Sequence, residues 1–312
     1  FLAVRKGGMR LEFSFWHPWL KKFFLIALPL MVGQTIIMLD EQFLRIFGSL
    51  LGSGTVSLLN YARRIAQVPI GLVGQACAVA SYPFLVQLLA QGKKTEFSET
   101  LHTAFQSGLS LIIPCVVWMI LAAEPVLTLI FQGGRFGQAE TLACVPLMQI
   151  MLLGVPLWIL YMVLVRAFYA HQDTLTPAVT GTVMTVLVLP VYAFFSSRIN
   201  AEALACTSVI SVSLYILWLV AIFWKRFGSA PFQGLLGVSL KTVLCTLPAA
   251  AIAYASLLFL QNLDCIPVLR AFIALSVSGL LFLFFFAPCI YFFLPELRTL
   301  LWPYIRKILR KR

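Results

Sequence analysis

The sequence contains 312 residues, of which 61% are hydrophobic and only 11% are charged. Soluble globular chains are about 45–50% apolar and about 25% charged, so the composition excludes an ordinary water-soluble fold. The formal net charge is +12, but the basic residues stand at the ends of apolar runs, which argues against nucleic-acid binding. The seven cysteines are scattered singly, which argues against a metal or redox site.

Eight apolar runs are long enough to cross a bilayer, because a hydrocarbon core of about 30 Å requires about 20 helical residues. The sequence therefore predicts an all-α integral membrane protein with about eight transmembrane helices. Basic segments at residues 1–22 and 294–312 flank them. The predicted spans are residues 23–51, 58–90, 102–123, 140–170, 176–196, 203–224, 235–260 and 268–293.

Basic residues gather on alternate sides of these spans. Lys93-Lys94 and Lys225-Arg226 fall on the same predicted side as both basic ends, whereas the opposite loops hold little beyond Arg135 and Arg198. Lys and Arg in short loops are retained in the cytoplasm, so both ends are predicted to be cytoplasmic. The first nine residues lack the order of a signal peptide, and we expect the chain to be a piece of a longer protein.

Three charged side chains interrupt the first predicted span, where each costs roughly 2.5–3.5 kcal/mol at a helix centre. Glu41 and Arg45 are four residues apart and can pair on one helix face. Asp40 projects about 100° away from Glu41 and needs another partner. The simplest interpretation of Glu41 and Arg45 is a structural pair near the membrane boundary.

The second predicted span carries two adjacent arginines, which cannot share one helix face. Arg63 is interpreted as an anchor that extends to the interface, and Arg64 as a side chain that points into a ligand cavity. Pro69 lacks a backbone N–H and frees the carbonyl one turn earlier, which predicts a kink beside a cavity.

Other polar groups have simpler explanations. Lys241 and Arg270 stand near the starts of the last two spans, where they suit interfacial anchors, and Glu124-Pro125 predicts a helix break. The sequence has no pattern of a catalytic triad, a phosphate loop, paired catalytic carboxylates or a zinc site. We therefore do not expect an enzyme.

Three segments are similar to the MurJ (MviN) family of lipid II flippases. Residues 47–69 resemble its seventh and eighth helices, and residues 131–136 resemble the periplasmic turn before its tenth helix. Residues 166–177 closely resemble the signature FYA-x-QDT-x-TP between its tenth and eleventh helices. The signature positions are Tyr169, Gln172, Asp173, Thr174 and Pro177.

The resemblance implies a fourteen-helix transporter of the multidrug/oligosaccharidyl-lipid/polysaccharide exporter superfamily. Residues 23–224 would form its second six-helix lobe and residues 235–293 its final helix pair; the first lobe of the same protein would be a missing partner. Such a protein lies in the bacterial inner membrane. It flips lipid II, an undecaprenyl-diphosphate-linked peptidoglycan precursor, from the cytoplasmic to the outer leaflet by alternating access, for cell-wall synthesis and without a cofactor.

The lipid II cargo indicates roles for the charged residues. The planar fork of arginine suits phosphate oxygens, so the resemblance favours Arg64 as a diphosphate contact, with Arg63 and Arg45 as secondary cations. Asp40 and Glu41 would balance their charge.

Three positions depart from the family pattern. Family members commonly carry acids where this chain has Arg63, Gln67 and Leu44, and Asp40 lies one turn before Leu44 on the same face. The asparagine often found late in the family's eleventh helix is also absent. A coupling role for Asp40, Glu41 or Gln67 therefore stays open, and the driving force, a monovalent cation or the membrane potential, stays unassigned.

Two alternatives to a lipid II flippase remain at this stage. One is a flippase or exporter of another lipid-linked saccharide or of a drug. The pair Arg63-Arg64 argues against a cationic drug, and the QDT-x-TP signature argues against other polysaccharide exporters. The other alternative is a non-transporting membrane scaffold that binds cell-division or wall-synthesis proteins. Membrane lipids are expected partners of the chain in either case.

Overall fold

The computed structural model describes residues 20, 23–24, 39–134, 136–196, 200–261 and 266–293. Within these ranges all named elements are helical, beginning with a helix at residues 39–49. The later elements are α3 (Thr55–Pro69), η1 (Ile70–Gly74), α4 (Gln75–Ala90), α5 (Lys94–Leu121), α6 (Ala123–Phe131), α7 (Gln138–Leu153), α8 (Val155–Ala170), α9 (Leu175–Ser196), α10 (Ala201–Phe227), η2 (Ala230–Phe232), α11 (Leu235–Leu260) and α12 (Pro267–Phe293).

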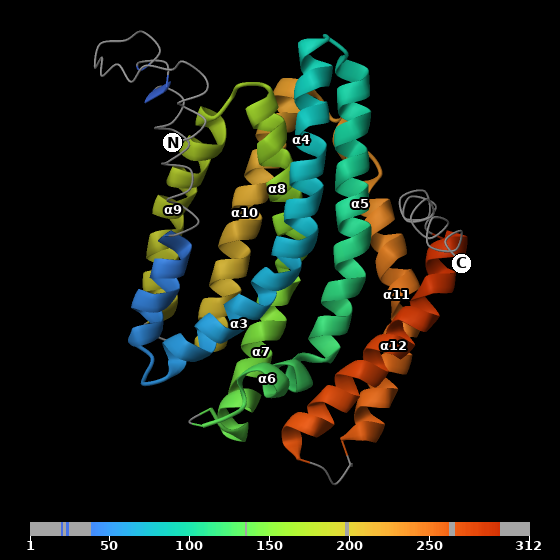
Figure 1. Ribbon diagram of the computed structural model, residues 1–312. Helices are drawn as coiled ribbons and strands as arrows, with labels where there is room; N and C mark the ends of the chain where they lie inside the picture. The colour runs from blue at the N-terminus through green and yellow to red at the C-terminus, as the bar shows by residue number, and fades with distance from the viewer. Residues whose placement is uncertain are drawn as a thin grey trace, which may run out of the picture.

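Seven helical stretches in the described part of the chain are long and apolar enough to cross a membrane. They correspond to the second through eighth predicted spans and run up and down beside one another (Figure 1). Of the first predicted span, residues 25–38 lie outside the described residues, and 39–49 are helical. The predicted basic ends also lie outside the described residues, apart from Leu20.

One predicted span is interrupted, and another is followed by a break and a short helix. The span predicted at 140–170 is two helices, α7 and α8, which meet at Gly154. Helix α5 ends at Leu121, and the short helix α6 begins at Ala123. Pro125 explains the second break, because a proline ring clashes with the carbonyl four residues earlier, here that of Leu121, but is tolerated in the first turn of a new helix.

The second predicted span changes direction after Pro69. Pro69 is the last residue of α3, and a π-helical turn, η1, separates it from α4. Helix α3 runs obliquely to α4 as a result (Figure 1). Proline and π-helical turns are both recognised causes of sharp kinks, so this sequence places a bend within one membrane-spanning stretch.

Small residues allow α4, α5 and α8 to approach closely around Ile159, which is fully buried in α8. A Cβ atom on Gly108 would lie 2.6 Å from Cγ2 of Ile159, and one on Gly74 would lie 2.7 Å from Sδ of Met162. Contacts of this kind are typical of membrane helices, which associate through close packing because lipid provides no hydrophobic driving force.

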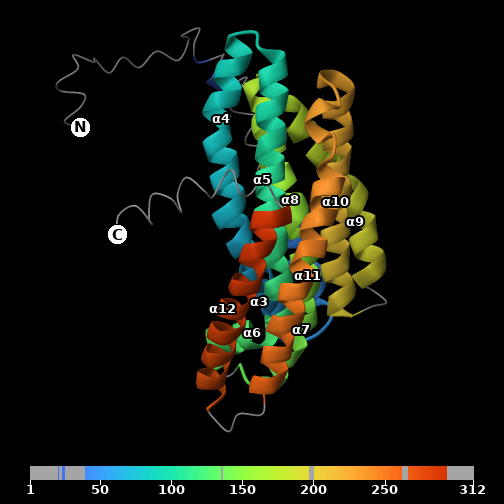
Figure 2. The same cartoon turned by 90° about the vertical axis from the view of Figure 1, so that its right-hand side faces the viewer.

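Helices α11 and α12 form a hairpin beside the other helices. α11 packs on α5 and α12 packs on α6, and Figure 2 shows the hairpin along that side. Its own small core joins Ala249, Ala250 and Ala253 of α11 to Phe282 and Phe286 of α12. The hairpin therefore contacts the helix bundle through one face and leaves many large apolar side chains exposed on the other.

Candidate functional site

Asp40 lies where three helices meet the helical segment 39–49. Its Oδ2 accepts hydrogen bonds from Nη1 of Arg63 at 3.0 Å and from the hydroxyl of Ser208 at 2.9 Å. Its Oδ1 accepts a hydrogen bond from the hydroxyl of Tyr192 at 2.8 Å. The donors come from α3, α10 and α9, so one carboxylate ties residues 39–49 to three separate elements.

The ion pair of Asp40 and Arg63 is largely withdrawn from the surface, with 14% and 13% of the respective side chains exposed. A buried charge requires both a counter-ion and hydrogen bonds to its remaining lone pairs. Arg63 supplies the opposite charge, and the two hydroxyls occupy further acceptor positions of the carboxylate. The structure therefore places Arg63 inside the bundle, where the sequence suggested an interfacial anchor.

Glu41 and Arg45 form the i,i+4 ion pair that their spacing predicted. Their side chains are 34% and 48% exposed, so the contact is much more open than that of Asp40 with Arg63. An exposed pair of this kind stabilises a helix by only a few tenths of a kcal/mol. Arg45 consequently remains accessible on the surface of this helix.

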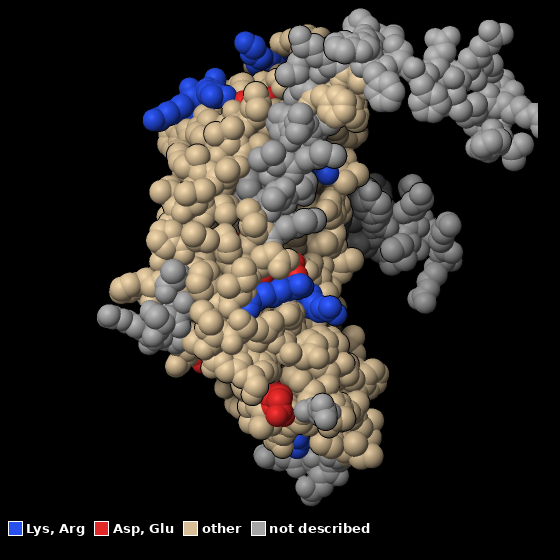
Figure 3. Space-filling model, turned by 90° about the vertical axis from the view of Figure 1, so that its left-hand side faces the viewer, with Lys and Arg blue, Asp and Glu red and all other residues tan. Residues whose placement is uncertain are grey.

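Arg64 and Gln67 lie on the exposed side of α3. Within the described residues Arg64 has neither an ion pair nor a side-chain hydrogen bond. Figure 3 shows basic and acidic atoms midway along one face, further basic atoms at its upper end, and smaller acidic and basic patches on its lower part. Arg64 is thus a cation with free donors beside the buried pair.

A cavity of about 260 Å³ opens beside the bend after Pro69. It is lined by Asp40, Arg63 and Gln67, by backbone and side chains of η1, and by α8 and α10. Gln75, at the start of α4, adds a second amide. The kink thus lies beside a cavity with polar groups, as Pro69 led us to expect. The sequence predicted that Arg64 points into a cavity, but Arg63 lines this one and Arg64 does not.

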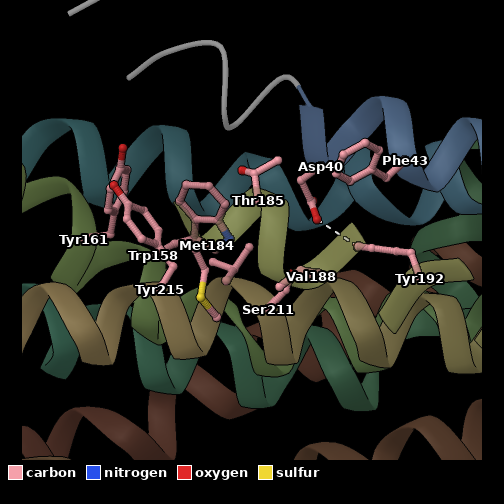
Figure 4. A pocket seen from close by; sticks show the side chains of 11 residues that line it. Asp40, Phe43, Trp158, Tyr161, Met184, Thr185, Val188, Tyr192, Ser211 and Tyr215 are labelled. Carbon is pink, nitrogen blue, oxygen red and sulfur yellow. Dashed lines mark hydrogen bonds between the residues drawn. The ribbon is translucent and has the colours of Figure 1, made fainter. Parts of the chain in front are cut away.

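A second, smaller cavity of about 40 Å³ adjoins Asp40 on its other side. Figure 4 shows aromatic side chains of α8, α9 and α10 around it, with Tyr192 hydrogen-bonded to Asp40. Its aromatic lining consists of Phe43, Trp158, Tyr161, Tyr192 and Tyr215. The ring of Phe47 stacks on that of Tyr192 at 5.8 Å, which fixes the hydroxyl that reaches Asp40.

The family signature lies at the turn between α8 and α9. Gln172 adopts a left-handed conformation, with φ of 59°. The N–H of Gln172 donates to the carbonyl of Tyr169 at 2.9 Å, and that of Asp173 to the carbonyl of Phe168 at 3.0 Å. This is the pattern that closes a helix at its C-terminus, so the first half of the signature ends α8.

The second half of the signature begins α9. Oδ1 of Asp173 accepts the backbone N–H of Thr176 at 2.9 Å, and Oδ2 accepts its hydroxyl at 2.6 Å. Nη1 of Arg226, at the end of α10, donates to Oδ2 of Asp173 at 2.8 Å. The hydroxyl of Tyr215 donates to the carbonyl of Pro177 at 3.1 Å. Thr174, between the two halves, is half-buried.

The signature is therefore a structural joint that fixes α8, α9 and α10 at one end of the bundle. It lies apart from the Asp40 cluster and lines neither cavity beside it. Across the described residues, no three His, Cys, Asp or Glu side chains are placed to hold a metal ion.

Comparison with known proteins decides the family. Residues 1–273 match the family described as "Lipid II flippase MurJ". The chain belongs to this family. With seven apolar helices of spanning length, it is a multi-pass inner-membrane protein.

Its relatives in the MurJ family are named as transporters and not as enzymes. A probable lipid II flippase MurJ of Rhizobium meliloti (strain 1021) is 28% identical over 257 residues, 81% of this chain and 48% of that protein. One of Buchnera aphidicola subsp. Schizaphis graminum is 25% identical over 271 residues, 82% of this chain and 50% of that protein. The chain thus spans about half the length of these relatives.

A solved structure of a lipid II flippase MurJ in an inward closed conformation has the same fold. Its TM-score is 0.67 at 21% identity, and the match covers 93% of this chain and 59% of that chain.

Sequence reasoning missed several residues of the Asp40 cluster and of the signature joint. Tyr192 and Ser208 read as ordinary polar residues in apolar helices, and nothing in their spacing linked them to Asp40. Arg226 read only as part of a basic helix end. The one available signal was negative: Asp40 had no local partner, so a distant one was required.

The Asp40–Arg63 pair allows a sharp test of stability. Arg63→Ala leaves a buried carboxylate without its counter-ion, and we expect a loss of about 3–5 kcal/mol in the free energy of unfolding. Arg63→Ala combined with Asp40→Asn should recover much of that loss, because no uncompensated charge remains. Arg64→Ala is the matched control and should change stability little, since Arg64 is exposed. Thermal unfolding in detergent measures all three; equal losses for Arg63→Ala and Arg64→Ala would contradict the burial argument.

The signature joint yields a second prediction. Asp173→Ala removes the acceptor for Thr176 and should cost about 1–2 kcal/mol, the usual value of a lost helix cap. Asp173→Asn keeps an acceptor oxygen for the backbone N–H of Thr176 and loses the Oδ2 contacts with the Thr176 hydroxyl and with Arg226. The Arg226 side chain is 55% exposed, so the cost should be below that of Asp173→Ala. Thermal unfolding midpoints compare the two, and an equal loss would show that the ion pair, not the cap, matters.

Proposed function

We propose that this chain is part of a transporter that flips lipid II from the cytoplasmic to the outer leaflet. Residues 23–224 would form its second lobe and residues 235–293 its final helix pair. Membership of the MurJ family supports the cargo. The observation that carries the proposal is Arg64, which has no partner among the described residues and stands beside an arginine already neutralised by Asp40.

The chemistry of the cargo suits this arrangement. A diphosphate that enters a bilayer needs cationic donors, because its charge is costly in a low-dielectric environment. Arg64 has unused donors, whereas the donors of Arg63 are partly engaged by Asp40. Arg45 is accessible but paired with Glu41. We assign Arg64 as the first diphosphate contact and Arg63 and Arg45 as secondary cations.

The cavity and the bend support an alternating-access cycle. Substrate sites of such transporters lie near the membrane midplane, where broken helices line a cavity. The polar cavity of about 260 Å³ lies beside η1, and π-helical turns occur frequently at functional sites. We expect the angle between α3 and α4 to change during the cycle, with Asp40 and Glu41 balancing the local charge and Gln67 contributing a neutral amide beside the bend.

The orientation follows from the positions of the basic turns. The turn at Lys93-Lys94 and the end of α10 at Lys225-Arg226 lie at one end of the bundle, with the signature turn (Figure 1). Basic residues in short loops favour the cytoplasmic side. We propose that this end, and both ends of the chain, are cytoplasmic.

Translocation of lipid II tests the proposal. Cells depleted of their own flippase would receive this chain with whatever sequence adjoins it in its natural protein, and outer-leaflet lipid II would be measured at matched membrane abundance. We expect rescue by the unaltered protein and a loss of about tenfold or more with Arg64→Ala, since a charge-assisted hydrogen bond contributes roughly 1.5–3 kcal/mol. Lys93→Ala, which removes an exposed cation at a turn, is the matched control and should rescue fully.

Other outcomes would overturn parts of the proposal. Full rescue by Arg64→Ala would reduce Arg64 to an interfacial anchor. Failure of the unaltered protein, when present at normal abundance, would indicate a different lipid-linked cargo or a scaffold.

A further inference from the structure

A third cavity lies away from the Asp40 cluster, between α6, α11 and α12. Its volume is about 290 Å³. It lies where the α11–α12 hairpin turns, at the end of the bundle opposite the signature joint. Its lining brings together Glu124 of α6 and Arg270 of α12, two charged residues 146 positions apart in the sequence that each seemed to have a local explanation.

The two charges face one cavity without pairing. Among the described residues, the ion pairs within 4.0 Å do not include Glu124 with Arg270. Nη1 of Arg270 donates instead to the carbonyl of Gln261 at 3.1 Å, which orients the guanidinium and leaves other N–H groups without a partner among the described residues. Glu124 has no side-chain hydrogen bond within the described part of the chain, and both residues are half-buried.

The local explanations do not cover this arrangement. A first-turn acid stabilises a helix start, which suits Glu124 in α6, and an arginine near a span end suits an anchor. Neither explains why opposite charges near lipid stay apart across a cavity, since attraction between them strengthens as the dielectric falls. A ligand that carries both signs would satisfy both groups at once.

The other residues that line the cavity indicate which chemical groups a ligand needs. Thr128 and Tyr254, which carry hydroxyl groups, also line the cavity, beside apolar residues such as Leu257. A primary ammonium donates three hydrogen bonds, which Glu124 and these hydroxyls can accept. A phosphate accepts the free N–H groups of Arg270.

The exposed surfaces beside the cavity are strongly apolar. Phe259 of α11 and Phe272 of α12 are 79% and 57% exposed, so acyl chains that extend from the cavity would meet compatible side chains. The cavity lies just below the range of about 300–1,000 Å³ that is typical of small-molecule pockets, which fits a headgroup better than a whole lipid.

We propose that this cavity binds the headgroup of a zwitterionic aminophospholipid, with its phosphate on Arg270 and its ammonium on Glu124. This lipid is a resident of the membrane and is distinct from the transported cargo. It would join the α11–α12 hairpin to α6 at the membrane interface. The inference does not depend on the proposed function.

Native mass spectrometry of the purified protein, expressed with whatever sequence adjoins this chain naturally, tests the site. Equal amounts of phosphatidylethanolamine, phosphatidylcholine and phosphatidylglycerol would be titrated separately. We expect phosphatidylethanolamine to bind most tightly, with about tenfold weaker binding for Glu124→Gln and for Arg270→Gln. Glu202→Gln and Lys241→Gln remove exposed charges outside the cavity and should leave binding unchanged.

Two results would overturn the proposal. One is unchanged phosphatidylethanolamine binding in both cavity variants. The other is equally tight phosphatidylglycerol binding that Glu124→Gln leaves intact, which would indicate a site for anionic lipids. If Arg270→Gln fails to fold, Arg270→Lys serves in its place, because it keeps the charge and loses the planar fork. We expect Arg270→Lys to bind phosphatidylethanolamine more weakly than the unaltered protein, with a smaller loss than Arg270→Gln would cause. Unchanged binding in both Arg270→Lys and Glu124→Gln would likewise contradict the site.

Discussion

The arrangement of the candidate site depends on neutralising one carboxylate inside an apolar bundle. Asp40 is surrounded by Arg63, Tyr192 and Ser208 from three helices, and removing its counter-ion alone would leave a charge that the bundle cannot solvate. Because Arg63 is used for this purpose, its neighbour Arg64 projects from the adjacent face of α3 with its donors unengaged among the described residues. In our proposal, structural and ligand-binding roles are thus divided between two consecutive arginines.

The bend after Pro69 determines where the polar side chains of α3 lie. Without η1, α3 and α4 would continue in one direction, and the polar side chains of α3 would face packed helices or lipid. With the bend, Arg63 and Gln67 line a cavity of about 260 Å³. The signature turn performs a separate task at the end of the bundle, where Asp173 and Arg226 hold α8, α9 and α10 together. The site and the signature that identifies the family are therefore different parts of the molecule.

The sequence predicted the structural features that depend on local spacing along the chain. Apolar runs of about 20 residues predicted the spans, the i,i+4 spacing predicted the pair of Glu41 with Arg45, and Pro125 predicted the break after α5. It could not find Tyr192 or Ser208, because they lie 152 and 168 positions from Asp40 and only packing brings them together. Arg63 was misplaced for the same reason: snorkelling to the interface and pairing with a distant carboxylate look alike until the neighbouring helices are in place.

An experimental structure with a diphosphate lipid bound tests the central claim most directly. The account predicts phosphate density against the guanidinium of Arg64, with Nη1 of Arg63 still about 3.0 Å from Oδ2 of Asp40. Phosphate bound to Arg63 with the Asp40 pair broken, or density remote from both arginines, would contradict the division of roles between the two residues.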